Sequence, residues 1–426
     1  MNKVKNSSRN ITPFGGLNFA LDAFKSLNID EPIVKYLGVR APNAKYSYTD
    51  TIQGLFANTL SQGSVLADID KLKIKFKEQI EWKCPSADTV EYACQELKSD
   101  NIVIVTEDNI THELNYNNKS NQALIAIALK TNLLYANTKG YDLDFDNVVI
   151  PTEKQDAKLS YKKVNGYHPS FATIGRVAVH VENRNGNTPA KYGQEDTLKR
   201  CFENLATHSI TIKNFRADSA SFQAKVINLV EEKARYFYIR NMNSQAYKSI
   251  CSLSTNWKST RIGNEYKEIA SVEYAPAGST NLHRVVVTRT KVKHGQTDVF
   301  TGQYSYYGIL TNNRELTDAE VILFYNQRAD SENTNRFLLN DFNLNHLPFP
   351  DMDTNTVYIY LMCICATLFE WLKKILIANK TPQITMSMRA KAICFHYISV
   401  ATEWIKSKGE EILIVYSNQK YAPLHL

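Results

Sequence analysis

Acidic residues occur in three separate segments from which a carboxylate could reach a shared cleft. Asp144 and Asp146 alternate with apolar residues, and Asp218 lies between a strand-like and a helix-like segment. Glu332 lies much later, in a stretch of helical texture. Carboxylate oxygens are preferred ligands of hard cations such as Mg²⁺, and a pair of such ions can support phosphodiester cleavage. Metal-assisted chemistry at phosphorus is therefore a candidate activity.

Each acidic segment also has a simpler structural explanation. An exposed strand with one acidic face accounts for Asp144 and Asp146. Asp218 is a suitable helix N-cap, and Arg328 with Glu332 would form a surface pair worth a few tenths of a kcal/mol. Taken singly, each site leaves these alternatives open. The combination is more specific: an acid on a first strand, an acid after a later strand, and an acid on a helix beyond an insertion.

Charge and cysteine usage limit the remaining classes of function. The chain of 426 residues has 50 Lys and Arg against 43 Asp and Glu, and its net charge of +7 favours a polyanionic partner without naming one. The spacing of the seven cysteines does not suit a zinc site, so reduced, mostly buried thiols are expected. They are Cys84, Cys94, Cys201, Cys251, Cys363, Cys365 and Cys394.

Two segments bear on the compartment. The uncharged run from Val357 to Phe369 falls short of the roughly 20 residues that cross a bilayer, so it predicts a buried helix. The stretch from Met1 to Asn10 is polar and lacks the apolar centre of a secretory signal. A bacterial cytoplasmic location, associated with the nucleoid and not with a membrane, is the expectation.

The first part of the chain, residues 1–136, predicts a helical N-terminal DNA-binding domain. Apolar residues recur at helical spacing in Thr51–Leu60, Thr89–Leu97 and Gln122–Leu134. A basic stretch from Lys71 to Lys77 precedes Pro85–Asp88, which opens a second helix. This order suits a helix-turn-helix lying across DNA, and a solvated face on an ordinary helix is the open alternative.

Residues 137–240 predict the first part of a mixed α/β core. The acidic strand from Tyr141 comes first, and alternating strands and helices follow it. The expected elements are a strand at Ala172–Val181, a helix at Glu195–Leu205, a strand at Ser209–Phe215, a helix at Ser219–Glu232 and a strand at Tyr236–Arg240.

Residues 241–313 predict a β-rich insertion subdomain, and residues 314–426 the second part of the core with C-terminal helices. Val285–Val287 and Tyr304–Thr311 are the clearest strands of the insertion. Helical texture then returns after Thr317, in Glu332–Phe342, in Thr354–Ala378 and in Thr385–Lys406.

Several motifs resemble one known family. The acidic strand with the later Gly166-Tyr167-His168-Pro169 turn, the segment Arg216-Ala217-Asp218-Ser219, and Tyr325, Arg328 and Glu332 at their spacing resemble the DDE transposases of bacterial insertion sequences, in the transposase DDE domain group 1 family. Ile11–Leu17, Tyr46–Asp70 and Glu182–Asn187 also resemble family sequences, so the resemblance covers nearly the whole chain.

This chain departs from the family pattern at two positions. The family signature continues to a Lys where this chain has Leu339, which removes an expected basic contact to the DNA backbone. The family also has Thr after the residue that follows its first acid, whereas Asn147 and Val148 follow Asp146. Asp144 therefore remains an alternative to Asp146 as the first catalytic acid.

The resemblance implies an α/β fold with a ribonuclease-H-like mixed-sheet core. It implies a magnesium-dependent enzyme, with Mn²⁺ as a substitute, that cleaves DNA at terminal inverted repeats and transfers the 3′ hydroxyl into target DNA. Asp146, Asp218 and Glu332 would hold the metal ions, with Asp144 as the alternative to Asp146. Tyr325 and Arg328 would contact DNA phosphate near the cut, and the enzyme would act as a homodimer on paired ends.

The insertion carries further candidate DNA contacts. Basic side chains there would neutralise phosphates, and Trp257 would stack on an unpaired base or, alternatively, anchor the core of the insertion. The basic candidates are Lys258, Arg261, Arg289, Lys291 and Lys293.

Two other functions compete with transposition. A nuclease on the same fold would cut DNA without joining it. A DNA-binding protein descended from a transposase would keep the cleft only as a scaffold, and Leu339 favours this interpretation. The presence of all three acids argues against it, because crowded carboxylates repel each other without a metal.

Overall fold

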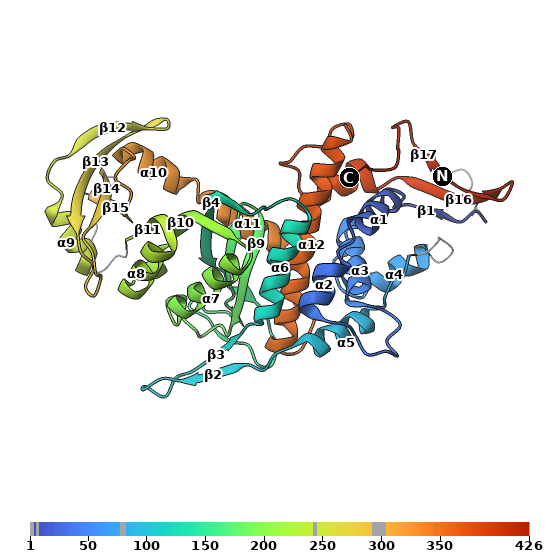
Figure 1. Ribbon diagram of the computed structural model, residues 1–426, viewed down its shortest axis with the longest axis horizontal. Coiled ribbons are helices and arrows are strands. Elements are labelled where there is room, and N and C mark those ends of the chain that lie inside the picture. The colour runs from blue at the N-terminus through green and yellow to red at the C-terminus, as the bar shows by residue number, and fades with distance from the viewer. Residues whose placement is uncertain (1–3, 6–7, 77–81, 242–244, 292–303, 426) are drawn as a thin grey trace.

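The computed structural model describes residues 4–5, 8–76, 82–241, 245–291 and 304–425, except for the side chains of 245–248 and 329–332. In Figure 1 the chain forms an elongated body. The insertion lies at one end, a large sheet with helices in the middle, and both termini at the other end.

One sheet of eleven strands organises the middle of the molecule, in the order β12-β13-β14-β15-β11-β10-β4-β8-β9-β3-β2. At its centre, β4 is parallel to β10, and β10 is parallel to β11. Strands β8 and β9 extend the other side in antiparallel pairing. The central strands are β4 (Asn137–Asn147), β8 (Ser170–Ile174), β9 (Val177–Arg184), β10 (Ile210–Ala217) and β11 (Ala234–Arg240).

The two faces of this sheet differ in chemistry because side chains alternate along each strand. On β4, Leu143 and Phe145 enter an apolar cluster with residues of α7 (Gln194–Thr207) and α8 (Ala224–Lys233). The intervening acids of β4 face the opposite side, where Asp146 contacts α11 (Ala329–Asp341). The expected mixed α/β architecture is confirmed, and the alternation places the acids on the α11 side.

Two elements of this region differ from the sequence prediction. The single strand expected at Ala172–Val181 is wrong: it is the hairpin β8–β9, which turns at Gly175 with φ of +58°, a conformation that glycine adopts without strain. The continuous helix expected at Ser219–Glu232 is also wrong. A short 3₁₀ turn, Ser219–Ser221, comes first, and α8 begins only at Ala224.

The insertion extends the central sheet instead of forming a separate one. Strand β15 pairs with β11, and β14, β13 and β12 follow outward in antiparallel order. Helix α10 packs against these strands. The elements are α9 (Gln245–Leu253), β12 (Lys258–Ile262), β13 (Glu265–Tyr274), β14 (His283–Lys291), β15 (Tyr304–Thr311) and α10 (Asp318–Asn326).

The N-terminal region is largely helical, as predicted, but it also contributes strands β2 and β3 to the edge of the large sheet. Residues 77–81, with Lys77 of the predicted basic stretch, lie outside the described residues. The elements are β1 (Ile11–Thr12), α1 (Gly16–Leu27), α2 (Asp30–Leu37), α3 (Tyr48–Leu60), α4 (Asp68–Lys75), α5 (Ala87–Leu97), β2 (Ile102–Val105), β3 (Thr111–Asn115) and α6 (Asn118–Lys130).

Helix α12 (Met352–Ala378) joins the N-terminal helices to the sheet. It contacts α3, α5, α6 and β9, and every residue from Val357 to Phe369 is buried, which confirms the predicted buried helix. Being apolar on all sides, such a helix needs partners all round. Among the described residues, no helix is long and apolar enough to cross a membrane.

The predicted helix at Thr385–Lys406 is wrong. Only α13 (Ala390–Ile393) and a following π turn are helical, and the chain then forms the hairpin of β16 (Ala401–Ser407) and β17 (Glu410–Tyr416). Lys408 and Gly409 between them have φ of 52° and 85°, which suits a two-residue hairpin turn. β1 completes this small sheet, and β5 (Ile150–Pro151), β7 (Asn165–Tyr167) and β6 (Lys158–Leu159) form another.

Candidate active site

Asp146 and Asp218 lie at neighbouring ends of two parallel strands. The last registered pair of β4 and β10 is Phe145 opposite Ala217, and the next residue along each strand is an aspartate. Asp218 also caps the 3₁₀ turn, since its carboxylate accepts a hydrogen bond of 3.0 Å from the backbone N–H of Ala220. Asp218 therefore has the expected capping role, but it caps the 3₁₀ turn and not helix α8, and the cap orients a carboxylate beside β4.

Asp144 is held differently. Its two carboxylate oxygens accept hydrogen bonds of 2.8 and 2.7 Å from Nε and Nη2 of Arg216, which lies opposite it on β10. Arg216 also donates from Nη1 to the carbonyl oxygen of Phe324 at 3.1 Å. This fork-to-fork geometry satisfies both oxygens of Asp144 inside the protein, so Asp144 acts here as one half of a buried ion pair.

Asp146 has two partners from the helical side. Nη2 of Arg328 lies 2.9 Å from Oδ1, and Nδ2 of Asn335 donates to Oδ2 at 2.9 Å. The side chains of Arg328 and Asp146 are 9% and 17% exposed, so this pair is only slightly accessible to water. Sequence reasoning missed Asn335, although it lies three residues after Glu332 and so on the same helical face.

Tyr325 and Arg328 attach the α10–α11 junction to both strand ends. The hydroxyl of Tyr325 donates to the carbonyl oxygen of Ala217 at 3.1 Å, directly before Asp218. Nη2 of Arg328 donates to the carbonyl oxygen of Phe145 at 3.4 Å, directly before Asp146. The structure thus gives both residues a positioning contact in the protein, and their contact with DNA stays a prediction.

The electrostatics of the site show that its charged groups act on one another. Burial raises the pKa of Asp146, and the charge of Asp218 raises it further, while Arg328 opposes both. For Arg328 burial acts against the charged form, but the carboxylates of Asp146, Asp218 and Asp144 hold its pKa above the ordinary value. The guanidinium therefore lies among these carboxylates as their counter-ion.

Glu332, the third expected acid, lies in the first turn of α11, and its side chain is outside the described part of the chain. Among the described residues no group of three or more His, Cys, Asp and Glu side chains could hold a metal ion. Asp146 and Asp218 offer hard oxygen donors on rigid strand ends, which fits a cation such as Mg²⁺ or Mn²⁺. Metal binding by these two carboxylates stays a prediction.

Two residues near the acids lie on either side of β7: Tyr161 in the β6–β7 connection and His168 directly after β7. Burial raises the pKa of Tyr161, and the charges of Asp218 and Asp146 raise it further, although its side chain is 70% exposed. Nothing in its sequence context indicated this position. His168 is buried and its Nδ1 lies 3.0 Å from the carbonyl oxygen of Thr188, which supports the structural role expected for it.

The predicted DNA contacts of the insertion lie far along the sheet from these acids. Trp257 packs against the core of the sheet, and the Arg289 guanidinium lies 4.3 Å from the centre of its ring. Arg289 also forms an ion pair of 2.9 Å with Glu268. These contacts support the anchoring interpretation of Trp257, and its stacking on a base stays a prediction.

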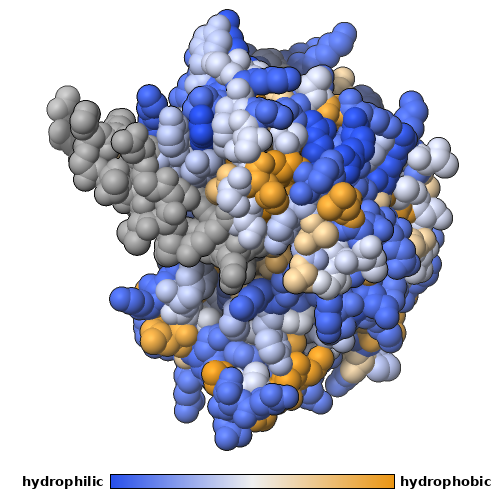
Figure 2. All heavy atoms as spheres, turned by 90° about the vertical axis from the view of Figure 1, so that its left-hand side faces the viewer, coloured by the Kyte–Doolittle hydropathy of each residue, from blue (hydrophilic) through white to orange (hydrophobic). Residues whose placement is uncertain are grey.

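The other basic candidates of the insertion are at the surface. Lys258, Arg261 and Lys291 are exposed, and Lys293 lies outside the described residues. Figure 2, which views the molecule from the insertion end, shows a largely hydrophilic surface with scattered hydrophobic patches. The exposure of Lys258, Arg261 and Lys291 is compatible with their proposed contacts with phosphate.

The model of the family transposase DDE domain group 1 matches residues 63–423. The chain belongs to this family. DDE transposases generally use divalent metal ions. At the position of the family Lys, Leu339 is partly buried and packs against the apolar core.

A solved structure with a similar arrangement is the piggyBac transposase in a synaptic complex with hairpin DNA, determined by cryo-electron microscopy. The two proteins are 12% identical, the match covers 92% of this chain and 82% of that one, and the TM-score is 0.45. No curated protein matches this chain.

Proposed function

We propose that this chain is the transposase of a bacterial insertion sequence, which cleaves DNA at terminal inverted repeats and joins the freed 3′ end to target DNA. The observation that carries the proposal is the meeting of Asp146 and Asp218 at neighbouring strand ends, with Arg328 as their counter-ion. Family membership supports the same activity. The five central strands with α7, α8 and α11 form the ribonuclease-H-like core of this proposal.

Asp146, Asp218 and Glu332 are the proposed metal-binding acids, and Mg²⁺, for which Mn²⁺ can substitute, is the proposed cofactor. When bound, such ions lower the pKa of the attacking water and neutralise charge on phosphate and leaving oxygen. Asp144 has a different proposed role. Its pairing with Arg216 holds β4 and β10 in register and leaves Asp146 as the first acid.

The residues around the acids orient the site for in-line displacement at phosphorus. In cleavage, the oxygen of water bonds to phosphorus as the bond to the 3′ oxygen breaks, and the 3′ oxygen leaves as a hydroxyl. In joining, that hydroxyl attacks a phosphodiester of the target and releases another 3′ hydroxyl. Asn335 and Arg328 fix the carboxylate of Asp146, and Tyr325 fixes the backbone next to Asp218.

The proposed partner is double-stranded DNA, both as element ends and as target. The solved piggyBac complex contains hairpin DNA, and the net charge of +7 is compatible with a polyanion. The N-terminal helices are the proposed readers of the inverted repeat, and the exposed cations of the insertion are proposed phosphate contacts. A homodimer on paired ends completes the proposal.

Cleavage of the DNA that flanks the gene tests this function. Duplexes carrying either flank are incubated with the full chain and Mg²⁺ or Mn²⁺, and nicks are mapped on a denaturing gel. Wild type is expected to cut at a repeat boundary, while Asp146→Asn and Asp218→Asn lose at least about 10²-fold in rate. The matched control is Asp142→Asn, on the same face of β4 and bonded to Asn214. Undiminished cutting by Asp218→Asn removes that residue from the site.

Joining separates a transposase from a nuclease on the same fold. A pre-cut flank with a free 3′ hydroxyl is offered together with a supercoiled plasmid. Covalent transfer of the labelled strand to the plasmid is expected. Cutting without transfer would favour the nuclease, and DNA binding without either reaction would favour a DNA-binding protein descended from a transposase.

A further inference from the structure

Two polar pockets lie side by side along α11 and share Arg389 as a lining residue. One, of about 500 Å³, extends from the Asp144–Arg216 pair to Arg389. The other, of about 390 Å³, extends from Arg389 to the end of α3 and its following loop. Together they make a depression, here called the α11 groove, that leads from the strand carrying the acids to the N-terminal region.

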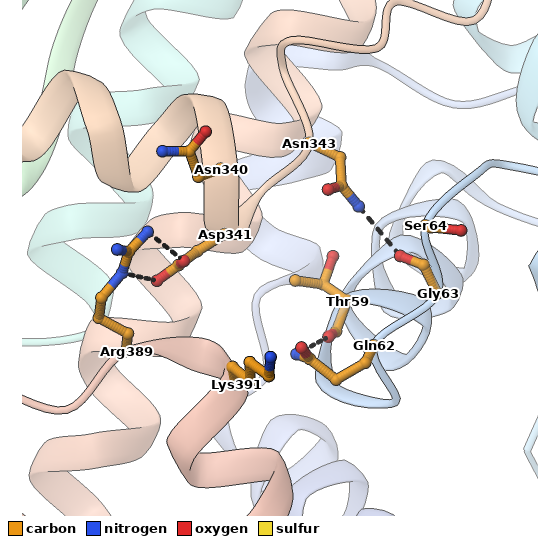
Figure 3. A pocket seen from close by; sticks show the side chains of 9 residues that line it. All are labelled: Thr59, Gln62, Gly63, Ser64, Asn340, Asp341, Asn343, Arg389 and Lys391. Carbon is orange, nitrogen blue, oxygen red and sulfur yellow. Dashed lines mark hydrogen bonds and ion pairs between the residues drawn. The ribbon is translucent and has the colours of Figure 1, made fainter.

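Figure 3 shows the second pocket from close by. Arg389 is bound to Asp341 by two hydrogen bonds, and Asn343 donates to the carbonyl oxygen of Gly63 across the loop. Lys391 and Gln62 project into the space between these contacts. The fixed pairs therefore form walls of the pocket, while Lys391 remains directed into it.

Helix α11 supplies the floor of the groove with a polar stripe. Asn333, Arg336 and Asn340 are exposed and recur at spacings of three and four residues, which places them on one face of the helix. Leu339 lies between them in sequence but packs against the apolar core. The positively charged side chain of this polar stripe is thus Arg336, about one helical turn before Leu339, where the family has Lys.

The groove has an excess of positive charge. Its described lining has five cationic side chains and two carboxylates. Both carboxylates, Asp144 and Asp341, are already in ion pairs with arginines of the groove. Arg336 and Lys391 have no ion pair among the described residues, so their charges face solvent. The cationic residues are Arg176, Arg216, Arg336, Arg389 and Lys391.

We infer that the α11 groove holds the sugar-phosphate backbone of the DNA strand that leaves the catalytic acids, with Arg336 and Lys391 as phosphate contacts. This inference rests on the proposed function. From Asn333 to Asp341 the helix spans roughly 12 Å, which corresponds to about three to four nucleotides of one strand. Amide and cationic donors that contact phosphate position DNA without reading its sequence.

The test compares two double variants of the full chain that each lose two exposed cations. Arg336→Gln/Lys391→Gln alters the groove. Lys199→Gln/Lys225→Gln alters exposed positions on α7 and α8, on the opposite face of the sheet. The affinity for a 30-base-pair duplex of arbitrary sequence is measured by fluorescence anisotropy over a range of salt concentrations. All four side chains are exposed, and thermal melting checks that both variants fold.

Loss of two phosphate contacts is expected to reduce the slope of log affinity against log salt by about 2 in the groove variant. The control variant keeps the wild-type slope. If wild type binds and cuts DNA but the two variants show equal salt slopes, the assignment of the groove is overturned. A wild-type chain that neither binds the duplex nor cuts the flanking DNA would instead overturn the proposed function.

Discussion

The strand-end site and the insertion hold their charges in different ways. At the strand ends, Arg328 and Asp146 are 9% and 17% exposed, and each has further hydrogen-bond partners in the protein. In the insertion, Arg289 and Glu268 are 20% and 40% exposed. A buried pair depends on both partners being present, whereas an exposed pair is screened by water and contributes little. The charged pair of the insertion therefore contributes less to the fold than the pair at the strand ends.

Removal of Arg328 is the change that tests this difference most strongly. Arg328→Met leaves the buried carboxylate of Asp146 without its counter-ion, so the metal-free protein is expected to lose about 3–5 kcal/mol of stability. Chemical denaturation measures the loss. The double variant Asp146→Asn/Arg328→Met is the control and should recover much of it. A loss of less than about 1 kcal/mol in the free energy of unfolding would mean that the Arg328–Asp146 pair behaves as an exposed surface pair.

Buried charge can also be tested by pH, at His180 on β9. His180 is fully buried, and burial lowers its pKa to about 4. The charges of Arg200 and Arg184 also lower this pKa, whereas the charge of Glu182 raises it. As pH falls, His180 therefore becomes protonated in the unfolded chain before it does in the folded chain. Stability should fall as pH drops from the unfolded value near 6.5 to about 4, by about 3 kcal/mol from this group.

Urea unfolding of wild type and His180→Leu between pH 7.5 and pH 4.5 measures that contribution as a difference. The variant should show a shallower loss on acidification. Parallel pH profiles would mean that His180 does not titrate differently in the folded and unfolded chains.

Metal binding is expected to stabilise the strand-end site and leave the insertion unaffected. At a metal concentration one hundred times its Kd, Mg²⁺ or Mn²⁺ should add about 2.7 kcal/mol to the stability of wild type. Asp146→Asn and Asp218→Asn should lose that increment, and Arg289→Gln should keep it. An increment that survives in both aspartate variants would place the metal elsewhere.

Replacement of Arg289 gives the smallest expected change in stability. Arg289→Gln removes a partly exposed ion pair and a stacking contact with Trp257, for a cost of about 1 kcal/mol or less. Its effect on DNA should exceed its effect on folding, with the salt slope of binding reduced by about 1. An unchanged slope would remove Arg289 from the phosphate contacts.

Periodicity in the sequence predicted the elements that carry the site but not the partners of each acid. β4, α7, β10 and α12 were evident from alternation and helical spacing, because each has one apolar face or is apolar throughout. Asp144 and Asp146 could not be separated in this way, since both lie on the same face of one strand. The distinction comes from Arg216 across the strand and from Arg328 and Asn335, which are far away in sequence.

The C-terminal hairpin shows a second limit of sequence reasoning. Trp404 and its neighbours in β16 were compatible with helical spacing, and the turn at Lys408–Gly409 was the signal that distinguished a hairpin. The helix beyond the insertion was correctly predicted to contain Glu332, and the metal-binding role of that residue stays a prediction.

The pairing of β15 with β11 has a mechanical consequence. Tyr238, Ile239 and Arg240 are in register with the end of β15, and Asn241 adds backbone and side-chain bonds to Gly308. Because these bonds make the insertion strands part of the same sheet as β4 and β10, the insertion can move relative to the acids only by twisting the sheet or by breaking these bonds (Figure 1). Any DNA that contacts both places would have to fit the spacing that this sheet allows.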